Sequence, residues 1–220
     1  MIYQSMSGDA DEGLASFTMN DGSLTNKNGD IFFVNNTVAT ISLENVLITN
    51  EDNDGVFLRA AAAGWGSEGS NGGHVTLNLT KQDVEGDIVV DEVSSLNMYL
   101  KNSSSFTGTI NTDNESQDIY VEIEDGSTWT LTEDSYITSL SCSAGSISLN
   151  GHKLYVNGVE YSEGSASEGE AIVVETSSSS HSKTEGFGNE MPSGDHKPGD
   201  GNTPPEKPDG ERPEKPNNGQ

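Results

Sequence analysis

The chain has 220 residues, of which 36 are acidic and 10 are basic, and its formal net charge at pH 7 is -26. Nucleic-acid binding depends on Lys and Arg side chains that neutralise phosphates, so this balance argues against nucleic acid and against anionic membrane surfaces as partners. Only 31% of the residues are hydrophobic. They are concentrated before residue 162, which leaves about 160 residues to build a core.

The first residues, "IYQSMSGDA", carry no basic and apolar export signal, and no apolar stretch of the chain is long enough to cross a bilayer. These first residues resemble a segment from the middle of a fold. We therefore expect no membrane insertion, and we expect the chain to lack the first coils of a longer structure. The sequence does not indicate an oligomeric state.

Two offset series of short apolar runs recur along the chain. The first comprises "FTMNDGSLT", "ISLENVLIT", "VTLNLTKQD", "LNMYLKNSS", "IYVEIEDGS" and "ISLNGHKLYVNG". Members of the second begin at Gly29, Asp54, Gly86, Gly108 and Asp134, so their spacings are 25, 32, 22 and 26 residues. Two strands in each repeat of about 24 residues, without helical periodicity, predict an all-β solenoid of stacked coils.

Alternation within these runs predicts which side chains face the core. The inward positions are Leu96, Met98 and Leu100 in one coil and Ile119, Val121 and Ile123 in the next. The outward positions are Asn97, Tyr99, Tyr120 and Glu122. Turn residues recur at Asp21, Asn45, Asp83, Asn102, Asp125 and Asn150, where the backbone is expected to leave the β region. Trp129 and Cys142 are expected in the core.

The loop "GWGSEGSNGGH" has the G-x-G-x-x-G spacing of dinucleotide-binding proteins at Gly64, Gly66 and Gly69. That fingerprint needs a helix after the glycines. Here the next residues, "HVTLNLT", alternate like a strand. The loop is therefore interpreted as an insertion between two strands, which also explains the 32-residue spacing.

From about residue 162 the pattern stops, and all seven prolines lie beyond this point. This Ser-, Gly-, Pro- and Glu-rich segment cannot bury enough apolar surface to offset its ordering entropy. The predicted organisation is a solenoid over residues 1–161 and a disordered acidic tail over residues 162–220, in which "EAIVVE" is a candidate last strand.

The segments "IYQSMSGDA", "GSLTNKNGDIFFV", "GWGSEGSNGGHVTLN", "GDIVVDEVSSLNMYLKNSSSFTGTINTD", "DGSTWTLTEDSYITSL" and "LNGHKLYVNG" resemble a family of bacterial cell-surface β-helix proteins. That family binds carbohydrate and is similar in fold to pectate lyases. The resemblance implies a right-handed parallel β-helix, export to the bacterial surface, binding of plant polysaccharides such as cellulose or polygalacturonate, and calcium. It covers nearly all of residues 1–161 and corresponds to C-terminal coils only.

Sugar rings stack on exposed aromatic side chains, and their hydroxyls bond to neighbouring amides and carboxylates. The candidates for carbohydrate binding are Trp65 in the inserted loop and Tyr99 and Tyr120 on adjacent coils. For the tyrosines, ordinary cross-strand packing remains an alternative.

Calcium takes six to eight oxygen ligands, and stacked coils align equivalent carboxylates. An offset of 22 residues would place Asp91 beside Asp113, near Asp87, and the "NEDNDG" turn offers Asp52 and Asp54. A solvated acidic face remains the alternative.

A pectate-lyase-like activity needs a Lys or Arg that removes a proton beside a calcium cluster. Before residue 162 the chain has only Lys27, Arg59, Lys81, Lys101 and Lys153, and they are scattered. We therefore predict a non-catalytic polysaccharide-binding protein outside the cell or on its surface. A structural or adhesive stalk is the alternative, and a polysaccharide lyase is a weaker one.

Overall fold

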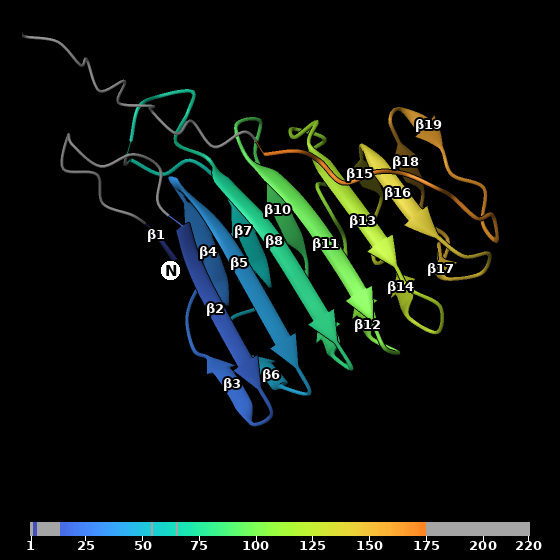
Figure 1. Cartoon of the computed structure of the whole chain (residues 1–220), viewed down its shortest axis with the longest axis horizontal. Helices are drawn as coiled ribbons and strands as arrows, with labels where there is room; N and C mark the ends of the chain where they lie inside the picture. Colours follow the sequence, from blue (N-terminus) through green and yellow to red (C-terminus); the bar gives the residue numbers. More distant parts are fainter. Residues whose placement is uncertain (1, 4–13, 54, 65, 175–220) are drawn as a thin grey trace, which may run out of the picture. The chain divides into compact units, whose positions relative to one another are not determined.

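The computed structural model describes residues 2–3, 14–53, 55–64 and 66–174, all of which lie in one compact unit, residues 1–180. The described part of the chain consists of strands, turns and loops without any helix, and successive coils stack so that equivalent strands pair in parallel (Figure 1). The predicted all-β solenoid is confirmed. Trp65 and Asp54 lie outside the described residues.

A complete coil has three strands, one more than the sequence pattern predicted. The third strand is short and lies within the first series of apolar runs, after the Asn or Asp corner, where the sequence pattern predicted only one strand per run. The coil therefore has three faces, each formed by one stack of strands.

The largest face, which we call the front sheet, has six parallel strands in the order β16-β13-β11-β8-β5-β2. These are β2 (Leu14–Asn20), β5 (Thr37–Glu44), β8 (Gly73–Thr80), β11 (Ser95–Lys101), β13 (Ile119–Ile123) and β16 (Ser139–Cys142). They lie side by side in Figure 1.

The second face precedes the front sheet in each coil. It contains β1 (Ile2–Tyr3), β4 (Phe32–Asn35), β7 (Leu58–Ala60) and β10 (Ile88–Val90), and then β15 (Ser135–Ile137), β18 (Leu154–Val156) and β19 (Val159–Glu160). Ile110 links the two groups, because it forms a parallel bridge with Ile88 and its carbonyl accepts a hydrogen bond from the Tyr136 amide.

The third face follows the front sheet and is divided into two sheets. One pairs β3 (Ser23–Asn26) with β6 (Leu47–Asn50), and the other contains β9 (Asp83–Glu85), β12 (Ser105–Thr107), β14 (Thr128–Thr130) and β17 (Ile147–Ser148). Strands β6 and β9 are neighbours in the stack but belong to separate sheets.

The inserted loop accounts for the irregular repeat length. Paired residues are 24 positions apart between β2 and β5 (Leu14 and Val38), but 36 apart between β5 and β8 (Thr37 and Gly73). Most of the extra residues lie between β7 and β8, and β8 is a strand. The loop is thus the insertion that the sequence predicted, without the helix that a dinucleotide site requires.

A continuous hydrophobic column fills the solenoid. All six predicted inward residues of β11 and β13 are buried, and Leu77 packs in the same column on β8. Trp129 is fully buried and its indole N–H donates to the Gly108 carbonyl at 3.0 Å. Cys142 is buried as predicted, and burial raises the pKa of its thiol.

The corners between strands use the predicted turn chemistry in part. Asp21, Asn45, Asn102 and Asn150 have positive φ angles, between 49° and 61°. Asp83 is instead the first residue of β9, and Lys81 has the positive φ at that corner. Stacking also aligns the corner side chains, since the Asn45 amide donates to the Asp21 carboxylate at 2.6 Å.

Residues 165–174, which we call the strap, run back from the last coil over the front sheet. Ser167 forms an antiparallel bridge with Cys142 on β16, the outermost strand. The Ser139 hydroxyl donates to the Glu170 carbonyl at 2.8 Å, and Ile172 bonds to the Asn97 side chain. These contacts extend to Ile172, beyond the expected boundary at 161, and residues 171–174 form no strand. Residues 175–220 of the predicted tail lie outside the described residues.

The strap and the last hairpin close the C-terminal end of the stack. β19 pairs with β18 in antiparallel fashion, so the chain reverses instead of adding another parallel coil. The strap occupies the edge of β16. Covering such edges prevents uncontrolled pairing with other chains.

Candidate functional site

The outer surface of the front sheet carries short polar side chains in straight rows. Parallel pairing in register places equivalent residues next to each other on successive strands, about 4.8 Å apart. One row contains Ser16, Thr40, Thr76, Asn97, Tyr120 and Ser139, and the next contains Thr18, Ser42, Asn78, Tyr99, Glu122 and Ser141. We call these the first and second rows.

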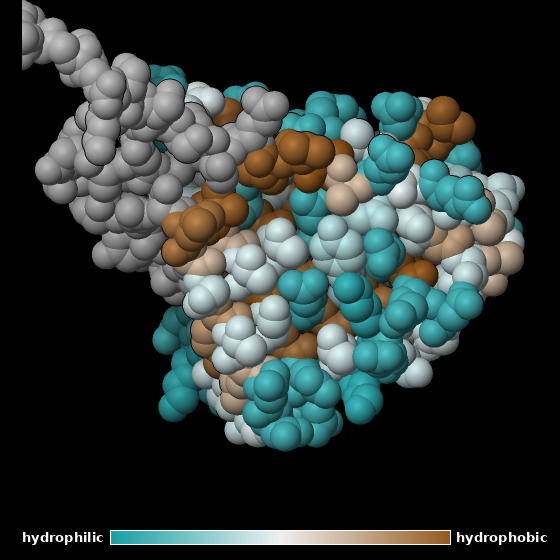
Figure 2. Space-filling view, in the orientation of Figure 1, coloured by the Kyte–Doolittle hydropathy of each residue, from teal (hydrophilic) through white to brown (hydrophobic). Residues whose placement is uncertain are grey.

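Figure 2 looks onto this surface. Pale and teal side chains cover most of it, which agrees with its Ser, Thr and Asn content, and brown atoms gather along its upper border near the end of the strap. Val173 in the strap is 83% exposed.

Tyr99 lies in the second row and is half-buried. Its ring meets the Tyr120 ring edge to face, with centroids 5.9 Å apart, and the Lys101 Nζ lies 4.9 Å from the centroid of the Tyr99 ring. Burial, and then the negative charge of Glu122, raise the pKa of Tyr99. The two tyrosines lie on adjacent coils, as predicted, and are diagonal neighbours in the ladder.

Tyr120 points outward as predicted, but only 3% of it is exposed. Its hydroxyl donates to the Glu122 carboxylate at 2.8 Å, and the strap is bonded to Ser139 and Asn97, its neighbours on both sides in the first row. The strap therefore passes over Tyr120. A ring covered in this way is not available to a ligand while the strap is in place, and sequence periodicity gave no signal of that cover.

The acidic side chains proposed for calcium mostly bond to the backbone of adjacent coils. The Asp91 carboxylate accepts from the amides of Ala62 at 2.7 Å and Val93 at 3.2 Å. Asp87 accepts from the Thr109 amide at 2.9 Å, and Asp52 accepts from the Gly29 amide at 2.6 Å. These carboxylates fix the corners of the solenoid.

The two coils that carry Asp87 and Asp113 pair with the predicted offset of 22 residues, since Ile88 pairs with Ile110. Beyond that pair the chain turns, because the Asn114 amide donates to the Asn111 carbonyl at 2.9 Å. Asp87 and Asp113 line one hollow, whereas Asp91 lines another with Glu92. Within the described ranges, no three His, Cys, Asp or Glu side chains form a group suited to a metal ion.

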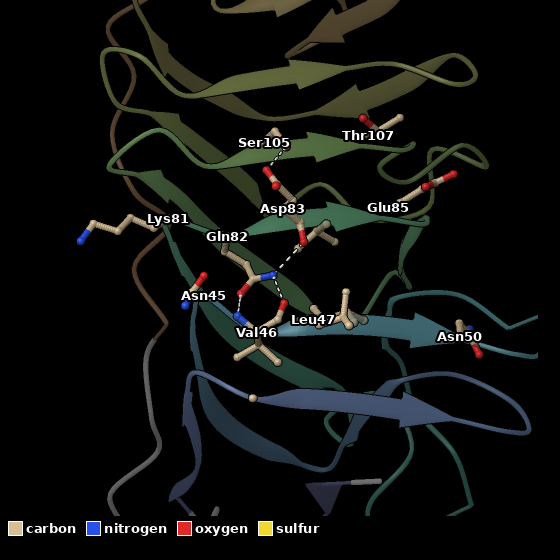
Figure 3. Close-up of a pocket in the computed structure, with 13 residues that line it drawn as sticks. Asn45, Val46, Leu47, Asn50, Lys81, Gln82, Asp83, Glu85, Ser105 and Thr107 are labelled. Carbon is tan, nitrogen blue, oxygen red and sulfur yellow. Dashed lines mark hydrogen bonds between the residues drawn. The ribbon is translucent and has the colours of Figure 1, made fainter.

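A groove of about 680 Å³ opens where β6 and β9 separate (Figure 3). The buried Gln82 side chain lines the groove and bridges its two sides: its amide nitrogen donates to the Val46 carbonyl at 2.7 Å, and its oxygen accepts from the Val46 amide at 2.8 Å. Figure 3 shows this amide between the two strands, with Asp83 and Glu85 on the β9 side. The amide thus links the two strands at a place where they do not pair in one sheet.

A smaller pocket of about 270 Å³ lies beside β15 and β18. Its lining includes Tyr136 and Tyr155, with polar side chains from the loop before β13 and from the β18–β19 turn. Sequence reasoning missed both tyrosines. Their equivalent places in "DSYITSL" and "HKLYVNG" were the available signal.

Comparisons with protein-family models, with curated proteins and with solved structures found no match. Among the described residues, no helix has the length and apolarity needed to cross a membrane.

Proposed function

We propose that this solenoid binds polysaccharide without catalysing its cleavage, and that the contact surface is the exposed part of the first and second rows around Tyr99. The observation that carries this proposal is the half-buried Tyr99 ring next to Asn78 and Thr76 on a regular sheet face. An aromatic ring offers an apolar surface to a pyranose, and adjacent amides and hydroxyls bond its oxygens.

The regular rows favour an extended ligand over a small molecule. Ser16, Thr40 and Thr76 continue the first row away from the strap, and Thr18 and Ser42 continue the second. Polar side chains at a constant spacing can bond the hydroxyl groups of a polymer, because these groups also recur regularly along its length. Cellulose fits the charge of the chain, because a neutral polymer is not repelled by a net charge of -26.

Binding of polygalacturonate, which is a polyanion, would need a cation between ligand and protein. Calcium is therefore part of the proposal only for acidic glycans, with Asp87 and Asp113 as its protein ligands in the hollow that they share. Display at a bacterial surface, membership of the carbohydrate-binding β-helix family and a right-handed coil are likewise proposed from the resemblance of residues 1–161. Right-handedness also agrees with the general rule for parallel crossovers.

Retention of the whole chain on cellulose and on polygalacturonate beads tests the proposal. Binding to either polymer that weakens in Tyr99→Ala, and not in the equally placed Ser141→Ala, supports it. If the protein passes through both columns, a structural or adhesive stalk becomes the better account. Appearance of unsaturated uronate products would instead support a lyase.

A further inference from the structure

The pocket beside β15 and β18 is built around a pair of stacked tyrosines. Tyr136 and Tyr155 are partners in the parallel ladder, their ring centroids are 5.0 Å apart, and their planes differ by 5°. Both side chains are half-buried, while Ser135 and Leu154 point into the core. The rings therefore lie on the outer side of the second face, away from the front sheet.

The loop that completes the pocket is held in place by one buried side chain. The Asn111 amide nitrogen donates to the carbonyls of Ser116 at 3.0 Å and Tyr136 at 3.1 Å, and its oxygen accepts from the Glu115 amide at 3.0 Å. The Thr138 hydroxyl also donates to the Gln117 carbonyl. These bonds fix residues 114–117 against β15, so a ligand would not have to order the pocket on binding.

The turn between β18 and β19 forms another side of the pocket. Asn157 has a φ of 49° and its amide donates to the Ile137 carbonyl at 2.8 Å, which fixes the turn next to Tyr155. The side chains of Asn114, Gln117 and Asn157 are exposed around the pocket. Each amide offers two donors and one acceptor oxygen, which matches the mixed donor and acceptor character of sugar hydroxyls.

The lining contains no charged side chain: it consists of Asn114, Ser116, Gln117, Tyr136, Ile137, Thr138, Tyr155, Asn157 and Gly158. This is unusual in a chain with 36 acidic residues. A carboxylate-bearing sugar would find no cation here to balance its charge, whereas a neutral sugar needs none. The volume of about 270 Å³ lies just below the range of about 300–1,000 Å³ for drug-sized ligands, so it suits one ring and not a chain segment.

We infer that this pocket is a second carbohydrate site, specific for a single neutral pyranose unit such as the end of a chain. Tyr136 and Tyr155 supply the apolar contact, and Asn114, Gln117 and Asn157 bond the hydroxyls. The inference rests on the proposed function for one point, the class of ligand. The pocket itself is independent of the front-sheet surface, because the two lie on different faces of the coil.

Titration of the whole chain with cellobiose and with digalacturonate, followed by the ring signals of isotopically labelled tyrosines, tests this inference. Phe substitutions assign the signals of Tyr99, Tyr136 and Tyr155. We expect cellobiose to shift the signals of Tyr136 and Tyr155, and digalacturonate to leave them unchanged. Gln117→Ala should weaken cellobiose binding about tenfold, which corresponds to loss of about 1.4 kcal/mol.

Tyr155→Ala should weaken it further, and an unchanged amide spectrum for the remaining coils checks that this variant folds. Thr132→Ala, on an exposed loop outside the pocket lining, is the matched control. If cellobiose shifts neither tyrosine while cellulose retains the protein, the pocket inference is wrong and the proposed function stands. If cellobiose shifts both tyrosines but Tyr99→Ala does not change retention on polysaccharide beads, the front-sheet proposal is wrong and the pocket stands. Equal shifts with digalacturonate overturn the specificity for neutral sugars.

Discussion

Asn97 and Ile172 form a reciprocal pair of hydrogen bonds across 75 positions of sequence: the Asn97 amide donates to the Ile172 carbonyl at 2.9 Å, and the Ile172 amide donates to the Asn97 oxygen at 2.8 Å. A side-chain amide presents the same donor and acceptor groups as a peptide. Asn97 therefore extends the backbone pairing of the front sheet outward and attaches the strap to it.

Asn97→Ala should release the strap. Loss of two hydrogen bonds predicts a decrease of about 1–3 kcal/mol in the free energy of unfolding. Local release also predicts faster amide exchange and proteolysis in residues 168–174, measured by mass spectrometry. Asn78→Ala is the control, because Asn78 makes only a 3.4 Å contact with Ser42 on the same surface.

Gly169→Ala tests the attachment of the strap by changing a residue of the strap instead of a residue of the sheet. A Cβ on Gly169 would lie 2.7 Å from the Leu140 carbonyl oxygen, a contact that requires the backbone to move. We expect this variant to expose residues 168–174 to protease as Asn97→Ala does. Protection equal to that of the parent chain in both variants would show that these contacts do not hold the strap.

Alkaline pH should destabilise the fold through buried tyrosines. Burial, and then the hydrogen bond to Glu122, raise the pKa of Tyr120 from 10.0 to about 12, and burial likewise raises the pKa of Tyr161 to about 12. A raised pKa means that the folded state holds the phenolic proton more tightly than the unfolded state does. This stabilisation is fully present below pH 10 and is lost as the pH rises to about 12.

Denaturant midpoints measured from neutral pH to pH 12 should therefore fall steeply above pH 10. Tyr120→Phe should reduce that fall, because the variant has one fewer raised pKa. A parent and a variant that lose stability in parallel over this range would contradict the assignment to Tyr120.

Gln82→Ala should weaken the junction between β6 and β9. The substitution removes both bonds to Val46 and one to the Asp83 carbonyl, at 2.7 Å, and it leaves the Val46 peptide groups without that partner. We expect a loss of about 2–4 kcal/mol in the free energy of unfolding, with faster amide exchange in residues 46–50. Gln117→Ala is the matched control because its side chain is exposed. Equal denaturant midpoints for the two variants would contradict a structural role of the Gln82 amide.

Calcium stays a prediction, and the structure suggests how to test it. Asp91→Asn disturbs a carboxylate that accepts two backbone amides, so it should cost stability with or without the ion. Asp113→Asn removes a charge in the hollow that it shares with Asp87. If calcium binds there, chelator should lower the Tm of the parent chain and leave that of Asp113→Asn unchanged. A parent Tm that does not respond to calcium or chelator argues for a solvated acidic face.

The sequence was sufficient to predict the solenoid, because alternation and spacing report directly on buried columns. Leu96, Met98 and Leu100 show this well, since each is fully buried. The third strand of each coil was missed because its runs are only two to four residues long, as in β17 and β3. Such runs are too short for alternation to stand out from a turn.

The environment of the candidate site was less predictable. Periodicity placed Tyr99 and Tyr120 on the outer surface, but the strap over Tyr120 depends on a contact between Asn97 and Ile172, in a segment whose composition indicated disorder. Predicting that Tyr136 and Tyr155 are neighbours would have required the register between their two coils. Paired residues of these coils are only 19 positions apart, fewer than the repeat of about 24 that the sequence suggested. Long-range contacts of this kind are not encoded in local pattern.

Retention of the whole chain on cellulose, compared between the parent, Tyr99→Ala and Ser141→Ala, tests the central claim most directly. Tyr99 and Ser141 are in the same row, and only Tyr99 offers an aromatic surface. We predict that the parent and Ser141→Ala are retained and that Tyr99→Ala binds at least about tenfold more weakly, a loss of about 1.4 kcal/mol. Equal retention of all three proteins, or no retention of the folded parent, would contradict polysaccharide binding by this face.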